Sequence, residues 1–306
     1  MKTLLVMLLL SVGTALANTK TEQIKIVVPF ATGGPTSNLA FQLQKSLTNE
    51  LKIPVIVDHR PGDGGSIGTS FAIQSHEPSL ILNTSSIVLN TFRNPQPYHD
   101  NQLRPTLYLG NIPLILVASK KSNIVNWRGL KNSNRILNYG SAGTGSTLHL
   151  SMETLNQTLK LNLTHVGYKG TSLLQTDLIA GHLDMAFMFA SRPTIELIKK
   201  GDLVALAVDN SQRLHELESV PTFKELGVTH MGNISWYVLF AAGQWNPNTL
   251  ASVQKSLQKT LTDSELSLPY KNFGLIWEKQ RLIPAPDFVA QQRKFMVGLV
   301  KYLTFE

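Results

Sequence analysis

Two glycine-rich segments, each lying between an apolar stretch and a helical pattern, restrict the possible folds of this chain more than any other feature. The apolar residues 24–30 lead into residues 31–38, which read ATGGPTSN, and residues 136–139 lead into residues 140–147, which read GSAGTGST. Such a sequence is typical of a strand, a tight turn and a helix. Because this unit occurs twice, about a hundred residues apart, we expect two similar lobes.

The rest of the chain alternates between short apolar runs and helical patterns. Extended segments are predicted at residues 55–57, 79–82, 114–118, 163–166 and 185–189, and helices at 147–159 and 172–180. This alternation is typical of an α/β protein. A chain of 306 residues with 42% hydrophobic residues exceeds the usual size of one domain and can bury two cores.

The two longest apolar runs, residues 114–119 and 234–242, predict strands that cross between the lobes. We therefore expect a discontinuous first lobe, formed by residues 18–118 and 234–306, and a continuous second lobe, formed by residues 119–233. Helices predicted around residues 249–262 and 286–301 would pack back on the first lobe.

The first residues have the pattern of a secretory signal peptide. Lys2 precedes an apolar run at residues 4–10, and the small residues Ala15 and Ala17 predict cleavage after Ala17, leaving residues 1–17 as the signal. The alternative, a membrane anchor, needs about 20 apolar residues. The chain has no cysteine, which excludes disulfides and a lipid-bearing cysteine. We expect a soluble, periplasmic monomer.

The charge is moderately basic, with 28 Lys and Arg against 20 Asp and Glu and a formal net charge of +8. A basic surface attracts an acidic ligand or an anionic membrane, but an ordinary solvated surface explains this balance as well, and we favour it. The basic residues are scattered, without the dense run typical of nucleic-acid binding. Nucleic acid is therefore not an expected partner.

The two glycine-rich segments are candidate anion sites. Glycines such as Gly33, Gly34 and Gly143 let the backbone turn and expose amide protons, and the positive end of the following helix dipole faces the turn. A simple capped turn, with Ser37 or Asn38 as the N-cap, is the alternative for the first segment. Two such turns facing one another across a cleft could hold one small anion.

Catalytic and cofactor sites are not predicted. The second segment lacks the third spaced glycine of a dinucleotide site and the Gly-Lys-Ser/Thr of a phosphate loop. No Gly-x-Ser-x-Gly elbow occurs, and the pair Ser146 and His149 has no obvious orienting acid. His149, His165 and His182 lack metal-ligand spacing. We expect no enzyme activity, no metal and no cofactor, with an exported hydrolase as the least favoured alternative.

Three further residues are candidates for contact with a ligand. Lys169 follows an extended segment and could meet a carboxylate, while Tyr168 could form a wall of the cleft. A surface lysine at a turn is an equally good interpretation. Asp184 precedes an apolar strand and could orient a ligand hydroxyl or amino group, although a cap on a turn is the favoured role.

Taken together, the ordered segments resemble the Bug family, the extracytoplasmic receptors of tripartite tricarboxylate transporters. The resemblance runs along nearly the whole mature chain. The segments that carry it are IVVPFATGGPTSN at 26–38, VIVDHRPGDGGSIG at 55–68, NYGSAGTGSTLHL at 138–150, THVGYKG at 164–170, AGHLD at 180–184, LVALAV at 203–208 and VPTFKELG at 220–227.

The resemblance implies a two-lobed periplasmic-binding-protein fold of the Venus-flytrap, type II-like kind, with two mixed sheets flanked by helices and two crossing strands. It implies a small carboxylate or dicarboxylate bound between the lobes. Together with the residues considered above, the predicted ligand-binding set is Phe30, Ala31, Thr32, Gly33, Gly34, Thr36, Ser37, Ser85, Ser86, Ser141, Ala142, Gly143, Thr144, Gly145, Ser146, Tyr168, Lys169 and Asp184.

The chain departs from the family pattern at three places. The family usually has aspartate where this chain has Asn38, a proline where it has Gly167, and an Asp-Gly-Tyr turn at residues 77–79, which here read EPS. Losing a negative charge at Asn38 would make the cleft more receptive to anions. The expected partner is a two-component membrane permease, with a membrane sensor kinase as the alternative.

Overall fold

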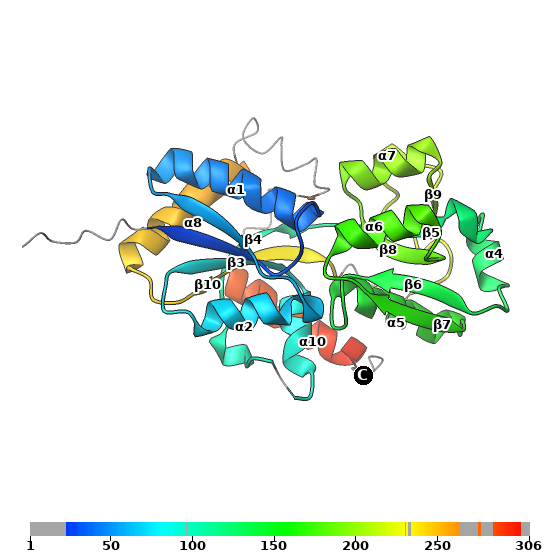
Figure 1. The fold of residues 1–306 in the computed structure, drawn as a ribbon, viewed down its shortest axis with the longest axis horizontal. Helices are drawn as coiled ribbons and strands as arrows, with labels where there is room; N and C mark the ends of the chain where they lie inside the picture. Colours follow the sequence, from blue (N-terminus) through cyan, green and yellow to red (C-terminus); the bar gives the residue numbers. More distant parts are fainter. Residues whose placement is uncertain are drawn as a thin grey trace, which may run out of the picture.

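The computed structural model describes residues 23–95, 97–229, 231, 234–262, 275–276 and 284–300. The chain forms two β-sheets side by side, each covered by helices (Figure 1). The predicted signal peptide lies outside the described residues. Within the described part, no helix is long and apolar enough to span a membrane.

The first sheet has the strand order β2-β1-β3-β10-β4. β1 runs parallel to β2 and β3, whereas β10 runs antiparallel to both β3 and β4. The elements of this half are β1 (Ile24–Val28), α1 (Pro35–Leu51), β2 (Val55–His59), α2 (Ser66–Gln74), β3 (Ser79–Thr84), α3 (Ser86–Leu89), β4 (Arg104–Asn111), β10 (Trp236–Ala242), α8 (Pro247–Thr262) and α10 (Ala285–Val300).

The second sheet has the order β7-β6-β8-β5-β9. β6 runs parallel to β7 and β8, and β5 runs antiparallel to β8 and β9. Its elements are β5 (Leu114–Ser119), α4 (Trp127–Lys131), β6 (Leu137–Ser141), α5 (Thr147–Leu159), β7 (Leu163–Gly167), α6 (Thr171–Ala180), β8 (Met185–Phe189), α7 (Arg192–Lys200) and β9 (Leu203–Asp209). The two sheets thus share one pattern of strand directions, as the repeated strand–glycine–helix unit predicts.

The chain passes between the sheets at two adjacent points. β4 ends at Asn111 in the first sheet and β5 begins at Leu114 in the second. The return segment reaches β10, and the Ile112 amide donates to the Ser235 carbonyl at 3.1 Å, which joins the two crossings. β5 therefore lies wholly in the second sheet, whereas the run 234–242 contains β10 of the first.

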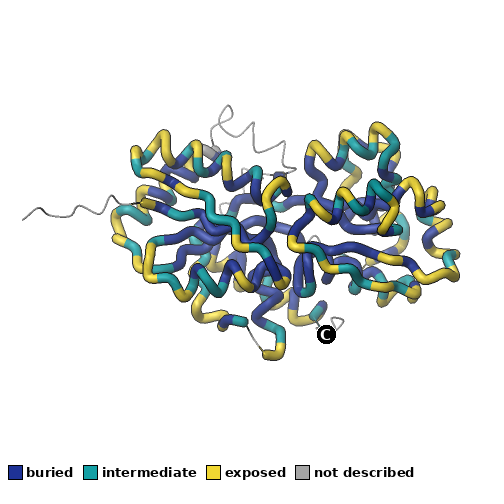
Figure 2. Tube along the Cα trace, in the orientation of Figure 1, coloured by how far each residue is buried: buried dark blue, intermediate teal, exposed yellow. Residues whose placement is uncertain are grey.

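Helix α1 shows how apolar spacing fixes an element on its sheet. Leu39, Leu43 and Leu47 recur every four residues and are fully buried, while Phe41 on the other side of the helix is 46% exposed. One apolar stripe at this spacing packs against a sheet, and burying each leucine contributes about 2 kcal/mol. The buried strands of both halves form continuous cores under exposed helix faces (Figure 2).

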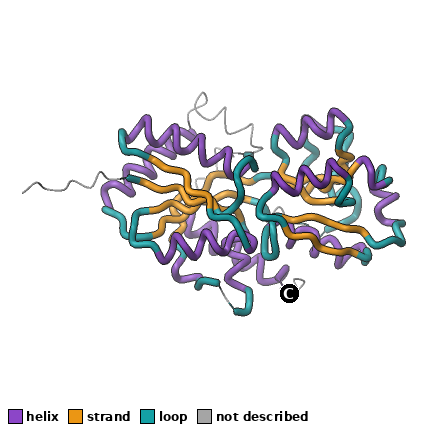
Figure 3. Tube along the Cα trace, in the orientation of Figure 1, coloured by secondary structure: helices purple, strands orange, loops and turns teal. Residues whose placement is uncertain are grey.

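The α/β class, with two mixed sheets and helices between the strands, is confirmed (Figure 3). The extended segments and the helices predicted at 147–159 and 172–180 are present. Sequence reasoning did not identify β4, which begins with Arg104 and Pro105, because its polar start hides the apolar alternation that follows. The predicted helix at 286–301 corresponds to α10, whose described part ends at Val300.

Candidate functional site

A narrow pocket lies where the loops after β1 and β6 meet between the two sheets. The pocket is nearly closed, because the space open to the centre of a water molecule within it is only about 10 Å³. It is lined by residues from both halves, namely Phe30, Ala31, Gly34, Thr36, Ser37, Thr84, Ala142, Ser146, Thr147, Leu148, Thr171 and Phe189. We call this space the binding pocket, residues 30–37 the first glycine loop, and residues 141–146 the second glycine loop.

The first glycine loop holds its polar groups at the start of α1. Gly34 is the N-cap of α1 and no side chain caps the helix. Because Pro35 has no amide proton, the amides at the start of α1 are those of Thr36 and Ser37. Thr36 Oγ1 lies 3.0 Å from the Tyr237 hydroxyl on β10. Ser37 Oγ lies 2.8 Å from Nε2 of His59, whose pKa is lowered mainly by burial. These contacts orient two hydroxyls at the pocket.

The second glycine loop is held by two histidines. Ser146 is the N-cap of α5, and its Oγ accepts from the backbone amide of His149 at 3.3 Å. Nδ1 of His149 in turn accepts from the Gly145 amide at 3.3 Å, and Ser141 Oγ lies 2.6 Å from Nε2 of His165. The loop is therefore fixed at both of its ends.

The two histidine rings lie stacked beneath the second glycine loop. Their centroids are 4.2 Å apart, and the Tyr139 ring stacks on His165 at 4.9 Å. Burial, followed by the nearby His165 ring, lowers the pKa of His149 to about 3. Burial also lowers the pKa of His165. Both rings are thus neutral at neutral pH, and His149 can accept the Gly145 proton.

A cluster of buried hydroxyls connects the two halves at the base of the pocket. Thr147 Oγ1, at the start of α5, lies 3.1 Å from Thr84 Oγ1 and 2.7 Å from Ser85 Oγ. Thr84 Oγ1 also lies 3.1 Å from Ser86 Oγ. Because each hydroxyl can donate and accept, the cluster can reorient its protons toward an anion.

A third loop, residues 63–65 after β2, presses its backbone against the second glycine loop. A Cβ added at Gly64 would lie 2.1 Å from the Thr144 carbonyl oxygen and 2.9 Å from the Ser146 amide nitrogen. Asn90 anchors this loop by donating to the Gly64 carbonyl at 3.2 Å. The contact between loops from the two sheets therefore needs a residue without a side chain at position 64.

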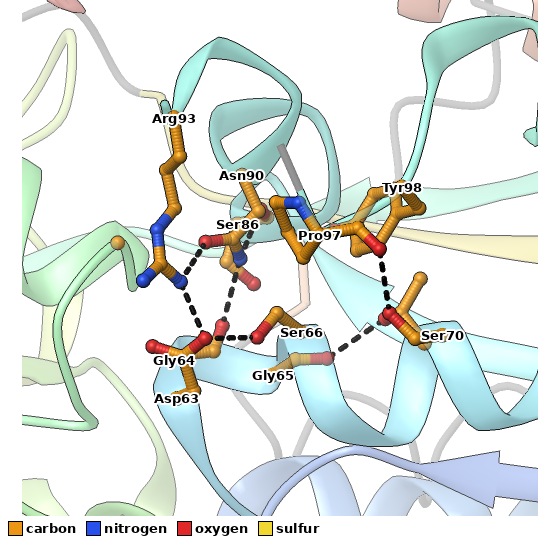
Figure 4. A network of polar contacts seen from close by, with 12 residues as sticks. Asp63, Gly64, Gly65, Ser66, Ser70, Ser86, Asn90, Arg93, Pro97 and Tyr98 are labelled. Carbon is orange, nitrogen blue, oxygen red and sulfur yellow. Dashed lines mark hydrogen bonds and ion pairs between the residues drawn. The ribbon is translucent and has the colours of Figure 1, made fainter. Parts of the chain in front are cut away.

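Charged and polar side chains stabilise this third loop (Figure 4). Arg93 donates to Asp63 at 2.6 Å and to Asn90 Oδ1 at 3.2 Å, and Ser66 also donates to Asp63. Although burial alone would raise the pKa of Asp63, the hydrogen bonds from Arg93 and Ser66 hold it below the usual value. The Asp63 carboxylate is thus held by partners of its own half, outside the lining of the pocket.

Two hydrogen bonds join the two halves beside the binding pocket, along a line of contact that we call the seam. The Ala31 amide donates to the Lys169 carbonyl at 2.9 Å, and Ser172 Oγ donates to the Thr32 carbonyl at 2.9 Å. Helix α6 begins at Thr171, with Gly170 as an N-cap that offers no side-chain bond. Helices α1, α5 and α6 therefore all begin at the pocket, and the ribbon shows α1 and α6 starting where the halves meet (Figure 1).

The structure brings part of the predicted site to the pocket and places the rest around it. Phe30, Ala31, Gly34, Thr36, Ser37, Ala142 and Ser146 line the pocket. Ser85 and Ser86 lie behind it in the hydroxyl cluster, Ser141 supports the second loop, and Gly143, Thr144 and Gly145 pack on the third loop or on Asn90. Thr32 and Gly33 lie on the exposed side of the first loop.

The other three predicted residues lie outside the pocket lining. The Lys169 side chain is exposed, and its contact with the first loop is through its carbonyl. The Tyr168 hydroxyl donates to Asp177 at 2.6 Å. Asp184 accepts from the Arg135 guanidinium at 2.7 Å and from the Asn138 amide at 2.8 Å. Tyr168 and Asp184 therefore support the second half, whereas Lys169 joins the two halves through its backbone.

Five lining residues were missed by sequence reasoning, and two of them had a usable signal. Thr84 stands where the apolar strand β3 turns into the polar run NTSS, and Thr147 follows the predicted cap Ser146. Polar residues at the carboxyl end of a parallel strand are candidates for a site. Leu148, Thr171 and Phe189 had no signal that distinguishes them from core or cap residues.

A larger hollow lies on another part of the molecule, beside the crossing at Pro113. Its charged residues include Arg192, paired with Glu196 at 2.9 Å, and Arg213, paired with Glu225 at 2.9 Å. These pairs are exposed and therefore contribute little. Because this hollow contains neither glycine loop, size alone does not make it the functional site.

Comparisons with known proteins agree on one family. The model of the tripartite tricarboxylate transporter family receptor matches residues 39–280. Protein BugT of Bordetella pertussis is 27% identical over 293 residues, covering 91% of this chain and 88% of its own. The periplasmic binding protein BugD has a TM-score of 0.81 at 27% identity, covering 91% of this chain and 96% of its own.

A further solved structure, MatC from Rhodopseudomonas palustris with bound malate, has a TM-score of 0.81 at 21% identity, covering 92% of this chain and 98% of its own. The predicted two-lobed periplasmic-binding-protein fold is thus confirmed, as is the likeness to the Bug receptors. Since the family model spans most of the chain, this protein belongs to the solute-binding receptors of the tripartite tricarboxylate transporter family.

Proposed function

We propose that this protein captures a small carboxylate in the binding pocket, outside the cytoplasmic membrane, and delivers it to a two-component membrane permease. The observation that carries the proposal is the convergence of three helix starts and several hydroxyls on one pocket between the two sheets. Backbone amides at helix starts and hydroxyl groups are donors that favour a carboxylate. The malate bound to MatC is a ligand of this class.

A few such donors are sufficient for useful affinity. A hydrogen bond to a charged group contributes about 1.5 to 3 kcal/mol, and micromolar affinity corresponds to about 8 kcal/mol. Three to five contacts from the two glycine loops and the hydroxyl cluster would supply this free energy. Five hydroxyl side chains line the pocket and can supply such contacts, namely those of Thr36, Ser37, Thr84, Ser146 and Thr147.

We propose that the two sheets belong to two lobes that close on the ligand. The bonds from Ala31 to Lys169 and from Ser172 to Thr32 join the first half to the second at the mouth of the pocket. A ligand that contacts both glycine loops favours the closed arrangement by its preferential affinity for it. The closed form would then be the form that the permease recognises.

Binding rather than catalysis is favoured by the surroundings of the two Ser–His pairs. Ser37 pairs with His59 and Ser141 with His165. In the described part of the chain, neither ring has a carboxylate as a hydrogen-bond partner. A serine nucleophile needs a base whose ring is oriented by a third group, so both pairs are better suited to holding the loops.

Thermal-shift titration with mono-, di- and tricarboxylates tests the binding proposal, because a ligand that binds only the native state raises Tm. We expect a saturable shift with one group of carboxylates and a smaller shift in Ser146→Ala. That variant also loses a helix cap, at a cost of about 1 kcal/mol. Asn126→Ala is the matched control, since Asn126 caps α4 by accepting from Gly129 at 2.8 Å.

The Asn126→Ala variant should lower Tm but keep the full ligand-induced shift. No shift with any carboxylate would overturn the binding proposal. The transport role is tested separately by measuring uptake of the identified carboxylate in cells that lack the receptor gene. Uptake should be abolished, and unchanged uptake would show that the protein does not deliver this carboxylate to a permease.

A further inference from the structure

The second half of the molecule has an end that lies opposite the binding pocket. The last residue of β5, Ser119, pairs there with the first residue of β9, Leu203, and β6, β7 and β8 all begin at the same edge of the sheet. The second glycine loop follows the other end of β6. Helix α4 lies at this far edge, away from the first half (Figure 1). We call this region the distal end.

Exposed basic side chains gather at the distal end. They belong to the turn after β5, to α4, to the segment before β6 and to the ends of α5 and α7, namely Lys120, Lys121, Arg128, Lys131, Arg135, Lys160, Lys199 and Lys200. The sequence has no acidic residue between Asp100 and Glu153. The positive charge that is scattered along the chain is therefore concentrated on this surface by the fold.

Few of these cations are neutralised by a neighbour. Arg135 pairs with Asp184 at 2.7 Å, and the others have no carboxylate partner among the described residues. Asp177 and Asp202 also lie near this end, and Asp177 accepts from the Tyr168 hydroxyl. The first half differs, since several of its cations have carboxylate partners, as in the pairs Lys25–Glu77, Lys259–Glu50 and Arg293–Asp100.

Two exposed aliphatic side chains lie among the distal cations. Val125 is 71% exposed and Ile136 is 60% exposed, which are the highest values among the large hydrophobic residues that the structure describes. The Arg135 guanidinium donates to the Ser122 carbonyl at 2.5 Å, which ties the segment before β6 to the turn that precedes Val125. Aliphatic groups surrounded by cations suit a surface that lies on the headgroups of an anionic bilayer.

The position of the distal end favours lipid over the permease as its partner. The distal end belongs to one half and lies away from the seam, so its shape does not depend on whether the halves are closed. A permease that recognises the closed form has to contact both halves. A lipid surface needs no such contact, and its negative charge attracts cations within about 8 Å in physiological salt.

We propose that the distal end binds the anionic lipid surface of a bilayer and keeps this receptor beside the membrane that contains its permease. The proposal rests on the proposed function only for the location of the protein outside the cytoplasmic membrane. Val125 and Ile136 enter the headgroup region, while the surrounding lysines extend their aliphatic stems and hold their charges at the level of the phosphates.

Co-sedimentation with lipid vesicles tests this inference. One set of vesicles contains phosphatidylcholine alone, and in the other about a third of the lipid is phosphatidylglycerol. We expect the partition coefficient to be about tenfold higher for the anionic vesicles at low salt. In about 0.5 M salt this difference should largely disappear, because the charges are screened.

Two sets of substitutions separate the distal end from the net charge of the protein. The test variant combines Lys120→Gln, Arg128→Gln and Lys131→Gln. The control removes the same charge from exposed positions of the first half, by Lys45→Gln, Lys52→Gln and Lys255→Gln. The test variant should lose about tenfold in partition onto anionic vesicles, and the control less than about twofold.

A third variant tests the aliphatic contact. Val125→Ser combined with Ile136→Ser should weaken partition onto anionic vesicles by about threefold or more, because two exposed apolar groups no longer enter the headgroup region. The ligand-induced shift in Tm should stay at its wild-type value in all three variants, since none of the substituted residues lines the binding pocket.

The outcomes separate this inference from carboxylate capture. Equal partition onto anionic and neutral vesicles, or equal losses in the test variant and the control, would overturn the inference. Binding only to neutral vesicles that carry the permease, lost in the test variant, would show that the distal end docks on a protein and that the lipid inference is wrong. Ligand-induced shifts in Tm report carboxylate capture separately, so either proposal can fail while the other stands.

Discussion

Replacing Gly64 by alanine should hold the two glycine loops apart. The added Cβ would lie 2.1 Å from the Thr144 carbonyl oxygen, whereas ordinary contact begins at 3.4 Å. The three nearest atoms all belong to the backbone of residues 144–146, so no side chain can rotate away. The loops must then separate by more than about 1 Å.

This separation should reduce ligand affinity. Ser146 belongs to the displaced loop and lines the pocket. Losing one hydrogen bond to a charged ligand costs about 1.5 to 3 kcal/mol, which corresponds to roughly a 10- to 100-fold increase in Kd. We expect this loss in Gly64→Ala by isothermal titration with the tightest-binding carboxylate.

A matched control removes the effect of backbone strain. Gly64 has φ +57° and Gly201 has φ +75°, and nothing lies within 4 Å of a Cβ at Gly201. Alanine in this left-handed region costs about 1 to 2 kcal/mol at either position. Gly201→Ala should therefore lose stability but keep the wild-type Kd. Equal Kd values for the two variants would refute the proposed contact between the loops.

Three further predictions concern stability and the role of single residues. The pKa of His149 is lowered to about 3, so the unfolded chain binds more protons than the folded chain below pH 6.5. Stability should therefore fall as the pH drops from about 6.5 toward 4, by up to about 1.4 kcal/mol per pH unit. Urea unfolding should show a shallower loss of stability with pH in His149→Gln and the wild-type loss in His215→Gln, and equal losses in the two variants would contradict this. Leu43→Ala should lower the free energy of unfolding by about 2 to 5 kcal/mol. Phe41 lies on the exposed side of α1, so Phe41→Ala should lower it by less than about 1 kcal/mol, and similar losses would show that the apolar stripe is assigned wrongly. Asp184→Ala should lower stability by about 1.5 to 3 kcal/mol, because it removes hydrogen bonds to Arg135 and Asn138. The Kd for the ligand should stay unchanged, and a tenfold higher Kd would instead support the ligand contact predicted from the sequence.

The sequence predicted those parts of the site that depend on local order along the chain. Gly34 and Ser146 each stand between a strand and a helix, and this order alone places them at helix starts. The number of lobes followed from the repetition of the same unit. In both cases each strand–glycine–helix unit can be recognised from its own neighbouring residues, without knowledge of contacts to the rest of the chain.

Features that depend on two distant segments were not predictable in this way. The Thr84–Thr147 contact joins β3 to α5, and the packing of Gly64 joins a loop after β2 to a loop after β6. Their existence depends on how the two sheets face one another, which no local pattern encodes. The segment DGG at 63–65 was recognised only as part of the family pattern at 55–68, and its partner is known only from the structure.

The most direct test of the account is a crystal structure of this protein with the tightest-binding carboxylate. The account predicts a carboxylate group between the two glycine loops, within hydrogen-bond distance of Ser146 Oγ and the backbone amides that begin α1, with both loops in contact. A carboxylate bound instead in the larger hollow beside Arg192 and Arg213, or held by one glycine loop alone, would contradict it.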